Sequence, residues 1–371
     1  MNTFDVAIVG AGIVGAACAV ALVREGLKVV IIDKYDVATG TTATGMGHIV
    51  AMDDSEAQFA LTSYSRKLWQ QLAERLPPEC EYERCGTIWV AADGDEMNEV
   101  HRKHSYYTQN GIGSEILDNK ALREAEPNLA ETLAGGLLVE SDCVVYQLAA
   151  NKYLIDKALS KGAVLQIGNG AASISEGCVQ MDDGSKINAN IIINAAGAAA
   201  PKLSPALRIV KRKGHLVITD RYNGFVQHQL IELGYLRSAH GRDGDSVAFN
   251  VQPRKTGQVL LGSSRQFGAE SPDIDHAILR RMTARAFEYM PKLRSLNAVR
   301  AWTGFRPATP DNLPYIGRIP ETTNVYAAAG HEGLGITTSL GTAELLAAEI
   351  VGRPPAIPAE PYSPSRQISQ H

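Results

Sequence analysis

FDVAIVGAGIVGAACAVALVREGLKVVIID, residues 4–33, has the order strand, glycine turn, helix, strand and acidic residue. Gly10 allows a tight turn, Gly12 lets the backbone approach a pyrophosphate, and Gly15 lets the helix lie close to the strand. The helix presents free N–H groups and the positive end of its dipole to phosphates. Asp33 follows Gly10 by 23 positions, close to the spacing of a carboxylate that binds a ribose 2′-OH. The stretch therefore predicts a Rossmann-type dinucleotide-binding unit.

Length and composition limit the classes of protein to which the chain can belong. At 371 residues it exceeds the usual size of one domain, so two lobes are expected. The net charge of −4 argues against a nucleic-acid groove, and the basic triplet 211–213 is interpreted as a solvated strand end. The five cysteines are scattered without a CxxC pair, which disfavours a disulfide framework, a zinc site or an iron–sulfur cluster and favours a reducing compartment.

The N-terminal apolar run is short, and no charged segment precedes it. It is therefore interpreted as a nucleotide-binding strand and not as a signal peptide. No apolar stretch approaches the roughly 20 residues that would span a bilayer. A soluble, cytoplasmic protein is predicted, with peripheral association with a membrane as an alternative.

After Asp33 the chain first continues in the nucleotide-binding lobe and then enters a second lobe. A Gly/Thr-rich loop at 39–48 suits a backbone that wraps phosphates, and it lets Met46 and His48 face the group with which the cofactor reacts. A helix at 55–75 is interpreted as core packing alone. The next segment is an insertion that belongs to a second lobe, with a strand at 87–91 and helices at about 95–109 and 120–127.

A helix at 148–160 returns the chain to the first lobe, and strands follow at 164–167, 172–175, 179–181 and 187–194. The last strand continues as IIINAAG, residues 191–197; its aliphatic run predicts burial on both faces, and its small residues are expected to meet the cofactor. A mostly antiparallel substrate platform is predicted next, with strands at 209–210, 215–219, 234–237, 247–252 and 259–262 and an amphipathic helix at 273–289.

A second strong signal lies in the last sixth of the chain. Residues 302–317 read WTGFRPATPDNLPYIG, and after a strand at 325–328 the segment 330–336 reads GHEGLGI and opens a last helix. This is again strand, glycine turn and helix, so a second helix N-terminus is placed to face a developing negative charge. The proline-rich tail from Gly352 is expected to run over the surface.

Three separated motifs now agree: GAGIVG with Asp33, the IIINAAG strand, and the late GFRP, DxLPxIG and AAGHEGLGI block. Over essentially its whole length the chain resembles the D-amino acid oxidase (DAO) superfamily of FAD-dependent amine oxidoreductases. AGHEGLGITTS and NVQPRKTGQVLLGSSRQ most resemble the subgroup of D-hydroxyproline dehydrogenase, the opine oxidases and the hydrogen cyanide synthase flavin subunit. The implied fold is α/β, with a discontinuous Rossmann-type FAD-binding domain at 1–80, 146–206 and 301–371, and a second α+β substrate domain on a mostly antiparallel sheet at 81–145 and 207–300.

By this resemblance the cofactor is FAD. The three early glycines would bind its pyrophosphate, Asp33 its adenosine ribose, and the segment 330–336 would approach the pyrimidine end of the isoalloxazine. No metal site is predicted. The predicted cofactor-binding residues are Gly10, Gly12, Ile13, Val14, Gly15, Asp33, Lys34, Thr41, Thr42, Gly45, Met46, Ala172, Ala196, Gly197, Gly330, Gly333, Leu334, Gly335, Ile336 and Thr337.

The family places a carboxylate-binding arginine in its GxRP motif, which is Arg306 here. A planar guanidinium holds a carboxylate in a bidentate way that lysine cannot reproduce. Glycine oxidase has a second arginine where this chain has Gly333, so a second clamp is in doubt and Glu332 is expected to touch a substrate amine or hydroxyl. His331 and Glu332 are the candidates to tune proton removal, and Met46 and His48 complete the predicted catalytic set.

The resemblance implies hydride transfer from the α-carbon of a neutral amine to flavin N5, leaving an imine. It points to D-hydroxyproline or D-proline as substrate, with glycine, sarcosine or an opine as the alternative. Oxygen, a quinone or a partner subunit is the electron acceptor. Several relatives act with small iron–sulfur subunits, so the chain is also a candidate flavin subunit of such a hetero-oligomer. A non-catalytic FAD scaffold is disfavoured because it has no need of Arg306, and a nucleic-acid modifying enzyme because the chain has no basic stripe.

Overall fold

The computed structural model describes residues 4–234 and 244–366. Within it the chain forms two compact units. Unit 1 comprises Met1–Cys80, Tyr146–Lys211 and Arg306–His371, and unit 2 comprises Glu81–Val145 and Arg212–Phe305. Each unit therefore collects segments that are far apart in the sequence. Their assignment as FAD-binding and substrate domains remains a prediction.

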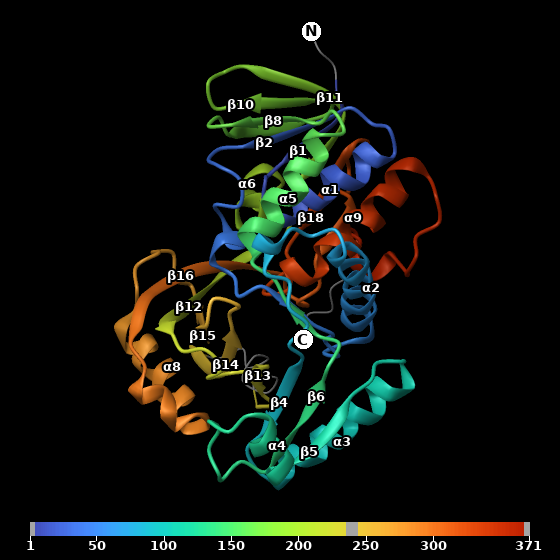
Figure 1. The fold of residues 1–371 in the computed structure, drawn as a ribbon. Coiled ribbons are helices and arrows are strands. Elements are labelled where there is room, and N and C mark those ends of the chain that lie inside the picture. Colours follow the sequence, from blue (N-terminus) through green and yellow to red (C-terminus); the bar gives the residue numbers. More distant parts are fainter. Residues whose placement is uncertain (1–3, 235–243, 367–371) are drawn as a thin grey trace. The chain divides into compact units, whose positions relative to one another are not determined.

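Unit 1 is built on a sheet with the strand order β17-β18-β11-β1-β2-β8 (Figure 1). The pairs β1·β2, β1·β11, β11·β18 and β2·β8 are parallel, and β17 is antiparallel to β18. The first glycine turn follows the strand at the centre of this doubly wound order. The strands are β1 (Phe4–Val9), β2 (Val29–Asp33), β3 (His48–Ile49), β8 (Val164–Ile167), β9 (Ala171–Ser175), β10 (Cys178–Met181), β11 (Lys186–Asn194), β17 (Tyr315–Arg318) and β18 (Val325–Ala329).

Strand β11 has two different halves. Its first half is antiparallel to β10, and its second half lies between β1 and β18, parallel to both. Ile192 and Ile193 are fully buried there, because a parallel strand covered on both faces excludes water from every side chain. The predicted burial of the IIINAAG strand is thus confirmed at its carboxyl end.

Helices cover the sheet of unit 1. α1 packs against both α5 and α9, and α2 packs against α9. Ser55 caps α2 by accepting a hydrogen bond from Gln58 N. The helical segments are α1 (Ile13–Arg24), α2 (Glu56–Ala73), α5 (Gln147–Leu159), α6 (Ala200–Leu203) and α9 (Gly335–Val351), with short 3₁₀ turns η1 (Thr41–Thr44), η2 (Pro78–Cys80), η3 (Gly197–Ala199) and η5 (Glu360–Tyr362).

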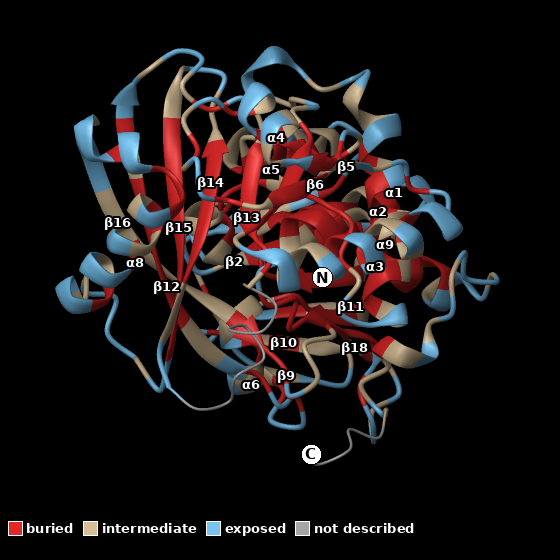
Figure 2. Ribbon diagram, turned by 90° about the horizontal axis from the view of Figure 1, so that it is seen from below, coloured by how far each residue is buried: buried red, intermediate tan, exposed pale blue. Residues whose placement is uncertain are grey.

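Unit 2 is built on a second sheet, with the order β16-β12-β15-β14-β13-β4-β6-β5. Its described pairs are antiparallel except β13·β4. α8 packs against β14 and β15, and Figure 2 shows buried residues along these strands. The elements are β4 (Thr87–Ala91), α3 (Gly94–Gln109), β5 (Glu115–Asp118), α4 (Asn119–Ala125), β6 (Gly135–Val139), β7 (Cys143–Val144), β12 (Val210–Arg221), β13 (Gln229–Glu232), β14 (Ser246–Pro253), β15 (Gln258–Phe267), α8 (His276–Tyr289), η4 (Pro291–Ser295) and β16 (Ala298–Ala308).

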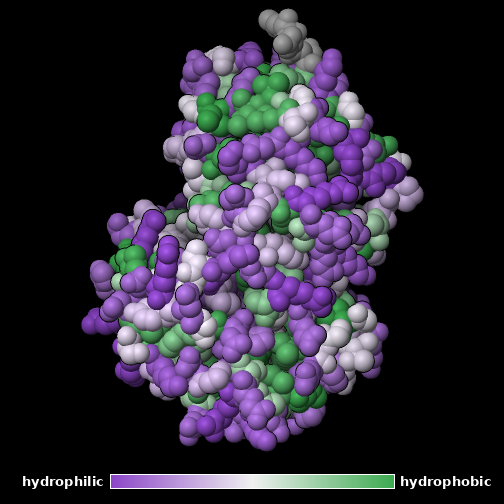
Figure 3. All heavy atoms as spheres, in the orientation of Figure 1, coloured by the Kyte–Doolittle hydropathy of each residue, from purple (hydrophilic) through white to green (hydrophobic). Residues whose placement is uncertain are grey.

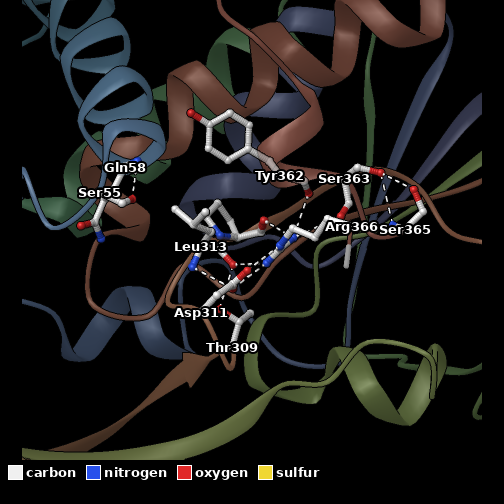
Figure 4. Close-up of polar contacts among 10 residues, drawn as sticks. Ser55, Gln58, Thr309, Asp311, Leu313, Tyr362, Ser363, Ser365 and Arg366 are labelled. Atoms are coloured by element: carbon white, nitrogen blue, oxygen red, sulfur yellow. Dashed lines mark hydrogen bonds and ion pairs between the residues drawn. The ribbon is translucent and has the colours of Figure 1, made fainter. Parts of the chain in front are cut away.

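The α/β fold class with a largely antiparallel second sheet is confirmed, and three local expectations are corrected or extended. The triplet 211–213 is not a solvated strand end, because it lies within β12 and Lys213 is 4% exposed. The tail runs over the surface for most of its length, as expected, but it is also anchored: Tyr362 is buried, and Arg366 binds the loop at 309–314 (Figure 4). The third concerns α2 and is described with the site. The strand predicted at 234–237 lies, apart from Gly234, outside the described residues.

The outer strand β8 of unit 1 carries exposed apolar side chains, Val164 and Ile167. Hydrophobic residues gather on that end of the unit, as Figure 3 shows. Elsewhere the visible face is mostly hydrophilic. Among the described residues, none of the helices has the length and apolar character needed to cross a membrane.

Candidate cofactor and substrate site

The first glycine turn has no room for a side chain at two positions. Gly10 has a φ of +119°, and a Cβ there would lie 2.4 Å from the carbonyl oxygen of Ala195. A Cβ at Gly15 would lie 1.9 Å from the carbonyl oxygen of Gly10. Both obstacles are main-chain atoms that have little freedom to move aside. The turn therefore requires glycine for its own packing, and α1 starts directly against β1.

Asp33, at the end of β2, holds the same turn from another side. Its Oδ2 accepts a hydrogen bond from Ala11 N at 2.7 Å, and its Oδ1 accepts one from Tyr35 N at 3.0 Å. Because each carboxylate oxygen has two acceptor positions, Asp33 retains capacity for a ribose hydroxyl. Lys34 forms an exposed ion pair with Asp182 at 2.9 Å.

The loop at 39–48 lies against the starts of both α1 and α9. Thr42 Oγ1 accepts a hydrogen bond from Ile13 N at 3.1 Å, which uses one of the free N–H groups of the first turn of α1. A Cβ at Gly45 would lie 3.1 Å from Ile336 Cδ1. Thr337 Oγ1 donates to the carbonyl oxygen of His48 at 2.8 Å. The structure thus brings together five residues that the sequence analysis placed around the cofactor.

Two buried amides on α5 reach the same loops, and the sequence analysis missed them. Asn151 Nδ2 donates to the carbonyl oxygen of Ala11 at 3.2 Å, and Gln147 Nε2 donates to that of Gly45 at 2.8 Å. Asn151 Oδ1 and Gln147 Oε1 are buried, and neither has a hydrogen-bond partner within residues 4–234 and 244–366. One of these buried acceptors lies beside the first glycine turn and the other beside Gly45, where a bound group with hydrogen-bond donors would satisfy them. Their i, i+4 spacing on the buried face of a helix was the available signal.

The second glycine turn lies beside Arg306. β16 ends just after this residue, and the carbonyl oxygen of Pro307 accepts a hydrogen bond from Glu332 N at 2.9 Å. A Cβ at Gly333 would lie 3.5 Å from Arg306 Nε and 3.6 Å from its Cδ. The half-buried Arg306 side chain therefore lies over an exposed glycine. Gly330 has a φ of +84°, and a Cβ there would lie 2.5 Å from Thr309 Cγ2.

His331 and Glu332 have different environments within this turn. His331 is 5% exposed, and its Nε2 lies 3.0 Å from Thr342 Oγ1 of α9. Burial lowers the pKa of His331 to about 3, so the imidazole is neutral near pH 7 and is a weak base. Glu332 has a φ of +47°, and its carboxylate accepts a hydrogen bond from Gly333 N. The carboxylate of Glu332 is therefore held in the same turn that Arg306 contacts.

α2 does more than pack against the core. Ser65 Oγ donates to the carbonyl oxygen of Thr337 at 2.6 Å and accepts from Gly341 N at 3.0 Å, and Trp69 Nε1 donates to the carbonyl oxygen of Ile336 at 3.1 Å. These bonds fix the first turns of α9. The expectation of core packing alone is corrected, because apolar periodicity does not reveal polar groups that act over a sequence distance of more than 260 residues.

The remaining predicted residues lie as follows. Ala196 and Gly197 follow β11 next to Ala195, whose carbonyl oxygen approaches Gly10. Ala172 is exposed on β9, in the antiparallel extension of the sheet. Met46 is 7% exposed. Cofactor contacts of these residues, of Lys34 and of the other predicted residues remain predictions. In the described part of the chain there is no cluster of His, Cys, Asp and Glu suited to a metal ion.

Comparison with known protein families matches residues 5–349 to the DAO family, described as FAD dependent oxidoreductase. The chain belongs to this family. FAD is accordingly the cofactor of this DAO-family enzyme, and the structure fits it: the first glycine turn has no room for a Cβ at Gly10 or Gly15, it lies at a helix N-terminus beside Asp33, and α5 carries two buried acceptors without partners among the described residues. The pyrophosphate would be held by the turn at 10–15 and the hydroxyls by Asp33 and the α5 amides.

Two named proteins match this DAO-family chain over nearly its full length. It is 27% identical over 386 residues to a glycine oxidase of Geobacillus kaustophilus, covering 100% of this chain and 98% of that protein. It is 25% identical to hydrogen cyanide synthase subunit HcnC of Pseudomonas aeruginosa, covering 93% and 92%. The crystal structure of the Geobacillus glycine oxidase superposes with a TM-score of 0.89, with 100% of both chains covered. An L-proline dehydrogenase from P. horikoshii shares the fold at 22% identity, with a TM-score of 0.89 and coverage of 98% and 97%.

Proposed function

We propose that this enzyme oxidises the carbon–nitrogen bond of a small amino acid with a free carboxylate, and that the substrate is glycine or an N-substituted glycine such as sarcosine. Arg306 carries the proposal, because it places a guanidinium beside the turn that opens α9. Full-length similarity to a glycine oxidase supports this substrate class over the cyclic D-imino acid that the sequence analysis ranked first. The proposal adopts the sequence analysis's alternative.

Arg306 would bind the substrate carboxylate through two parallel hydrogen bonds. Such a pair fixes the orientation of the α-carbon as well as its position, which a lysine ammonium does not do. FAD, when bound, supplies the redox chemistry by accepting a hydride from that carbon.

The amine must lose its proton before a hydride can leave the α-carbon. His331 is a poor acceptor because burial lowers its pKa to about 3, so it is no longer a favoured candidate for this step. The Glu332 carboxylate is proposed to accept a hydrogen bond from the substrate amine, since it is held in the turn that lies against Arg306. Glu332 would take the proton that the ammonium loses, so that the imine product leaves without any proton on His331.

The test is the anaerobic reduction of the bound flavin by glycine, sarcosine and cis-4-hydroxy-D-proline, followed at the visible flavin bands. Arg306→Ala should lower kcat/KM by about a hundredfold or more, because two hydrogen bonds to a charged group are worth about 1.5 kcal/mol or more each. Arg306→Lys should recover only part of the loss. Arg318→Ala, an exposed arginine on β17 of the same unit, is the matched control and should behave as wild type.

Two results would contradict the proposal. Wild-type kcat/KM in Arg306→Ala would remove Arg306 as the carboxylate-binding group. Bleaching of the flavin bands by cis-4-hydroxy-D-proline, but not by glycine or sarcosine, would show that the substrate is a cyclic D-imino acid. Admitting air to the bleached sample then separates the electron acceptors: rapid return of the oxidised bands identifies an oxidase, and persistent reduced flavin identifies a dehydrogenase that passes electrons to a quinone or a partner subunit. The name of the HcnC relative, a synthase subunit, supports testing the second case.

A further inference from the structure

The segment that follows α9 is anchored by two side chains. Tyr362 is 1% exposed, and its hydroxyl donates to the carbonyl oxygen of Ala57 in α2 at 2.6 Å. The side chain of Arg366 is 8% exposed and lies over the ring of Tyr315, 4.3 Å from its centroid. Figure 4 shows the guanidinium directed toward Asp311 and Leu313. The tail is therefore fixed both to α2 and to the loop at 309–314.

Arg366 donates to three acceptor groups of the loop at 309–314: the Asp311 carboxylate and the carbonyl oxygens of Leu313 and Pro314. Its Nε and Nη2 donate to the two carboxylate oxygens of Asp311 at 2.7 and 2.8 Å, in the bidentate arrangement. Nη2 also donates to the carbonyl oxygen of Leu313 at 2.7 Å, and Nη1 donates to that of Pro314 at 3.1 Å. The loop at 309–314 contains two prolines, which have no N–H to donate. The tail therefore supplies the donors that hold this loop.

The loop at 309–314 follows Arg306 closely in the sequence and contacts the second glycine turn in space. It continues directly from β16, which carries Arg306, and Thr309 fits beneath Gly330, where a Cβ would lie 2.5 Å from its Cγ2. Thr309 Oγ1 donates to the carbonyl oxygen of Leu313 at 2.8 Å, the same atom that Arg366 contacts. Displacement of the loop would thus be transmitted both to the base of Arg306 and to the turn at 330–333.

We propose that Arg366 is a positioning residue for substrate binding: by fixing Asp311 and the loop at 309–314, it sets the orientation in which Arg306 meets the substrate carboxylate. The inference rests on the proposed function of Arg306. Burial raises the pKa of Asp311, but the hydrogen bonds and positive charge of Arg366, together with hydrogen bonds from Leu313 N and the Thr309 hydroxyl, outweigh burial and bring the pKa below its usual value. The pair is therefore ionised at neutral pH, and neither member can be removed without leaving a half-buried charge.

The experiment compares holoenzyme carrying Arg366→Met, Arg366→Lys, Asp311→Asn, or Arg366→Met with Asp311→Asn. Three quantities are measured: KM and kcat for glycine, the Kd of glycolate from the perturbation of the flavin spectrum, and the FAD content. Glycolate carries the carboxylate without the amine, so it reports on Arg306 alone. Arg366→Met should raise KM and the glycolate Kd together by about tenfold, with kcat changed less than threefold and the FAD content unchanged.

The remaining variants sharpen the assignment. Arg366→Lys should fall between wild type and Arg366→Met, because it keeps the charge and loses the bidentate contact. The double variant should be no worse than the more damaging single variant, because both remove one contact. Arg353→Met is the matched control: Arg353 follows α9 and pairs with Glu25 at 3.3 Å and Glu344 at 3.2 Å, so its loss should leave KM and the glycolate Kd at wild-type values.

Failure of this inference is distinguishable from failure of the proposed function. If Arg306→Ala weakens glycolate binding while Arg366→Met lowers only thermal stability and leaves the glycolate Kd unchanged, Arg366 is a structural residue and the inference is overturned. If Arg306→Ala also leaves the glycolate Kd unchanged, Arg306 does not bind the carboxylate and the proposed function itself has failed.

Discussion

The two glycine turns of unit 1 have the same order of strand, turn and helix, yet their glycines avoid different atoms. At Gly10 and Gly15 an added Cβ would meet main-chain atoms at 2.4 and 1.9 Å. At Gly330 and Gly333 it would meet side chains, those of Thr309 and Arg306. The first turn is therefore determined by backbone packing, whereas the second is shaped around particular side chains.

This difference separates two tasks. Where a glycine is required by main-chain atoms, as at Gly10 and Gly15, no change of a neighbouring side chain can make room for a Cβ, which suits the binding of an invariant cofactor. A turn packed against side chains changes with them, which suits discrimination among substrates. We therefore expect substitutions in the first turn to affect FAD binding and the fold, and substitutions in the second turn to affect substrate parameters. Three glycine variants test this expectation and a fourth variant tests the buried histidine of the second turn; they follow in decreasing order of effect.

Gly15→Ala should have the largest effect. Its Cβ would lie 1.9 Å from the carbonyl oxygen of Gly10, so α1 must move away from β1, at a cost of about 3 kcal/mol or more. The purified protein should have lost FAD, measured by the ratio of visible to ultraviolet absorbance, and should unfold at a lower temperature. Gly94→Ala is the control, because no atom lies within 4 Å of its Cβ. Full FAD content in Gly15→Ala would refute the backbone argument.

Gly330→Ala should destabilise unit 1 by about 2 kcal/mol, because alanine is strained at a φ of +84° and its Cβ would clash with Thr309 Cγ2. FAD should be retained while KM rises. Thr309→Ser removes that methyl group and keeps the hydroxyl that donates to Leu313. In the double variant with Gly330→Ala, Thr309→Ser should restore KM in part, while the backbone strain of alanine at a positive φ remains. If the combination restores nothing, the clash with Thr309 is not the cause.

His331→Gln tests the buried histidine of the second turn through pH. The unfolded chain binds a proton at His331 below about pH 6.5, whereas burial lowers the pKa of the folded state to about 3. The free energy of unfolding of the wild-type protein therefore decreases as the pH falls from 6.5 toward 3. His331 accounts for about 2 kcal/mol of this decrease by pH 5. In urea unfolding, the difference between the free energies of unfolding at pH 7.5 and pH 5.0 should be smaller in His331→Gln than in the wild-type protein. Equal differences in the two proteins would mean that His331 is protonated in the folded state.

Gly333→Ala should have the smallest effect. Its Cβ would make ordinary van der Waals contact with Arg306, at 3.5 Å from Nε, and Gly333 is exposed. We expect a change in unfolding free energy within about 0.5 kcal/mol and a change in KM of less than threefold, with FAD content unchanged. Loss of FAD in this variant would show that the second turn, like the first, is needed for FAD binding.

The parts of the fold that the sequence predicts are those with a local signal. The strand at 87–91 and the last helix match the structure because each has a local signal: the strand is an apolar run that follows Gly86, and the helix follows a glycine turn. β13 was missed because it reads QLIE, with polar residues at both ends. Gln229 is satisfied by Thr87 Oγ1 and Glu232 by Arg285, partners 142 and 53 positions away. A local pattern carries no trace of such partners.

The candidate site divides in the same way. The glycine turns and Arg306 stand out because their spacing along the chain is itself the signal. Asn151, Ser65 and Arg366 do not, because each acts on a loop or helix that arrives from another part of the sequence. In particular, the tail crosses the surface as its prolines predict, but its composition gives no sign that Tyr362 is buried.

The order of strands in unit 1 sets the time at which the domain can form during synthesis. Val6 pairs with Ile191, Ile192 pairs with Val325, and α1 packs against α9, which ends at Val351. At about 5–20 residues per second, the roughly 330 residues between the end of α1 and the end of α9 take about 15 to 65 seconds to synthesise, and the apolar α1 has no partner helix during that time. Unit 1 must therefore complete its folding late in translation, and we expect its nascent N-terminal third to depend on chaperones that cover apolar surface.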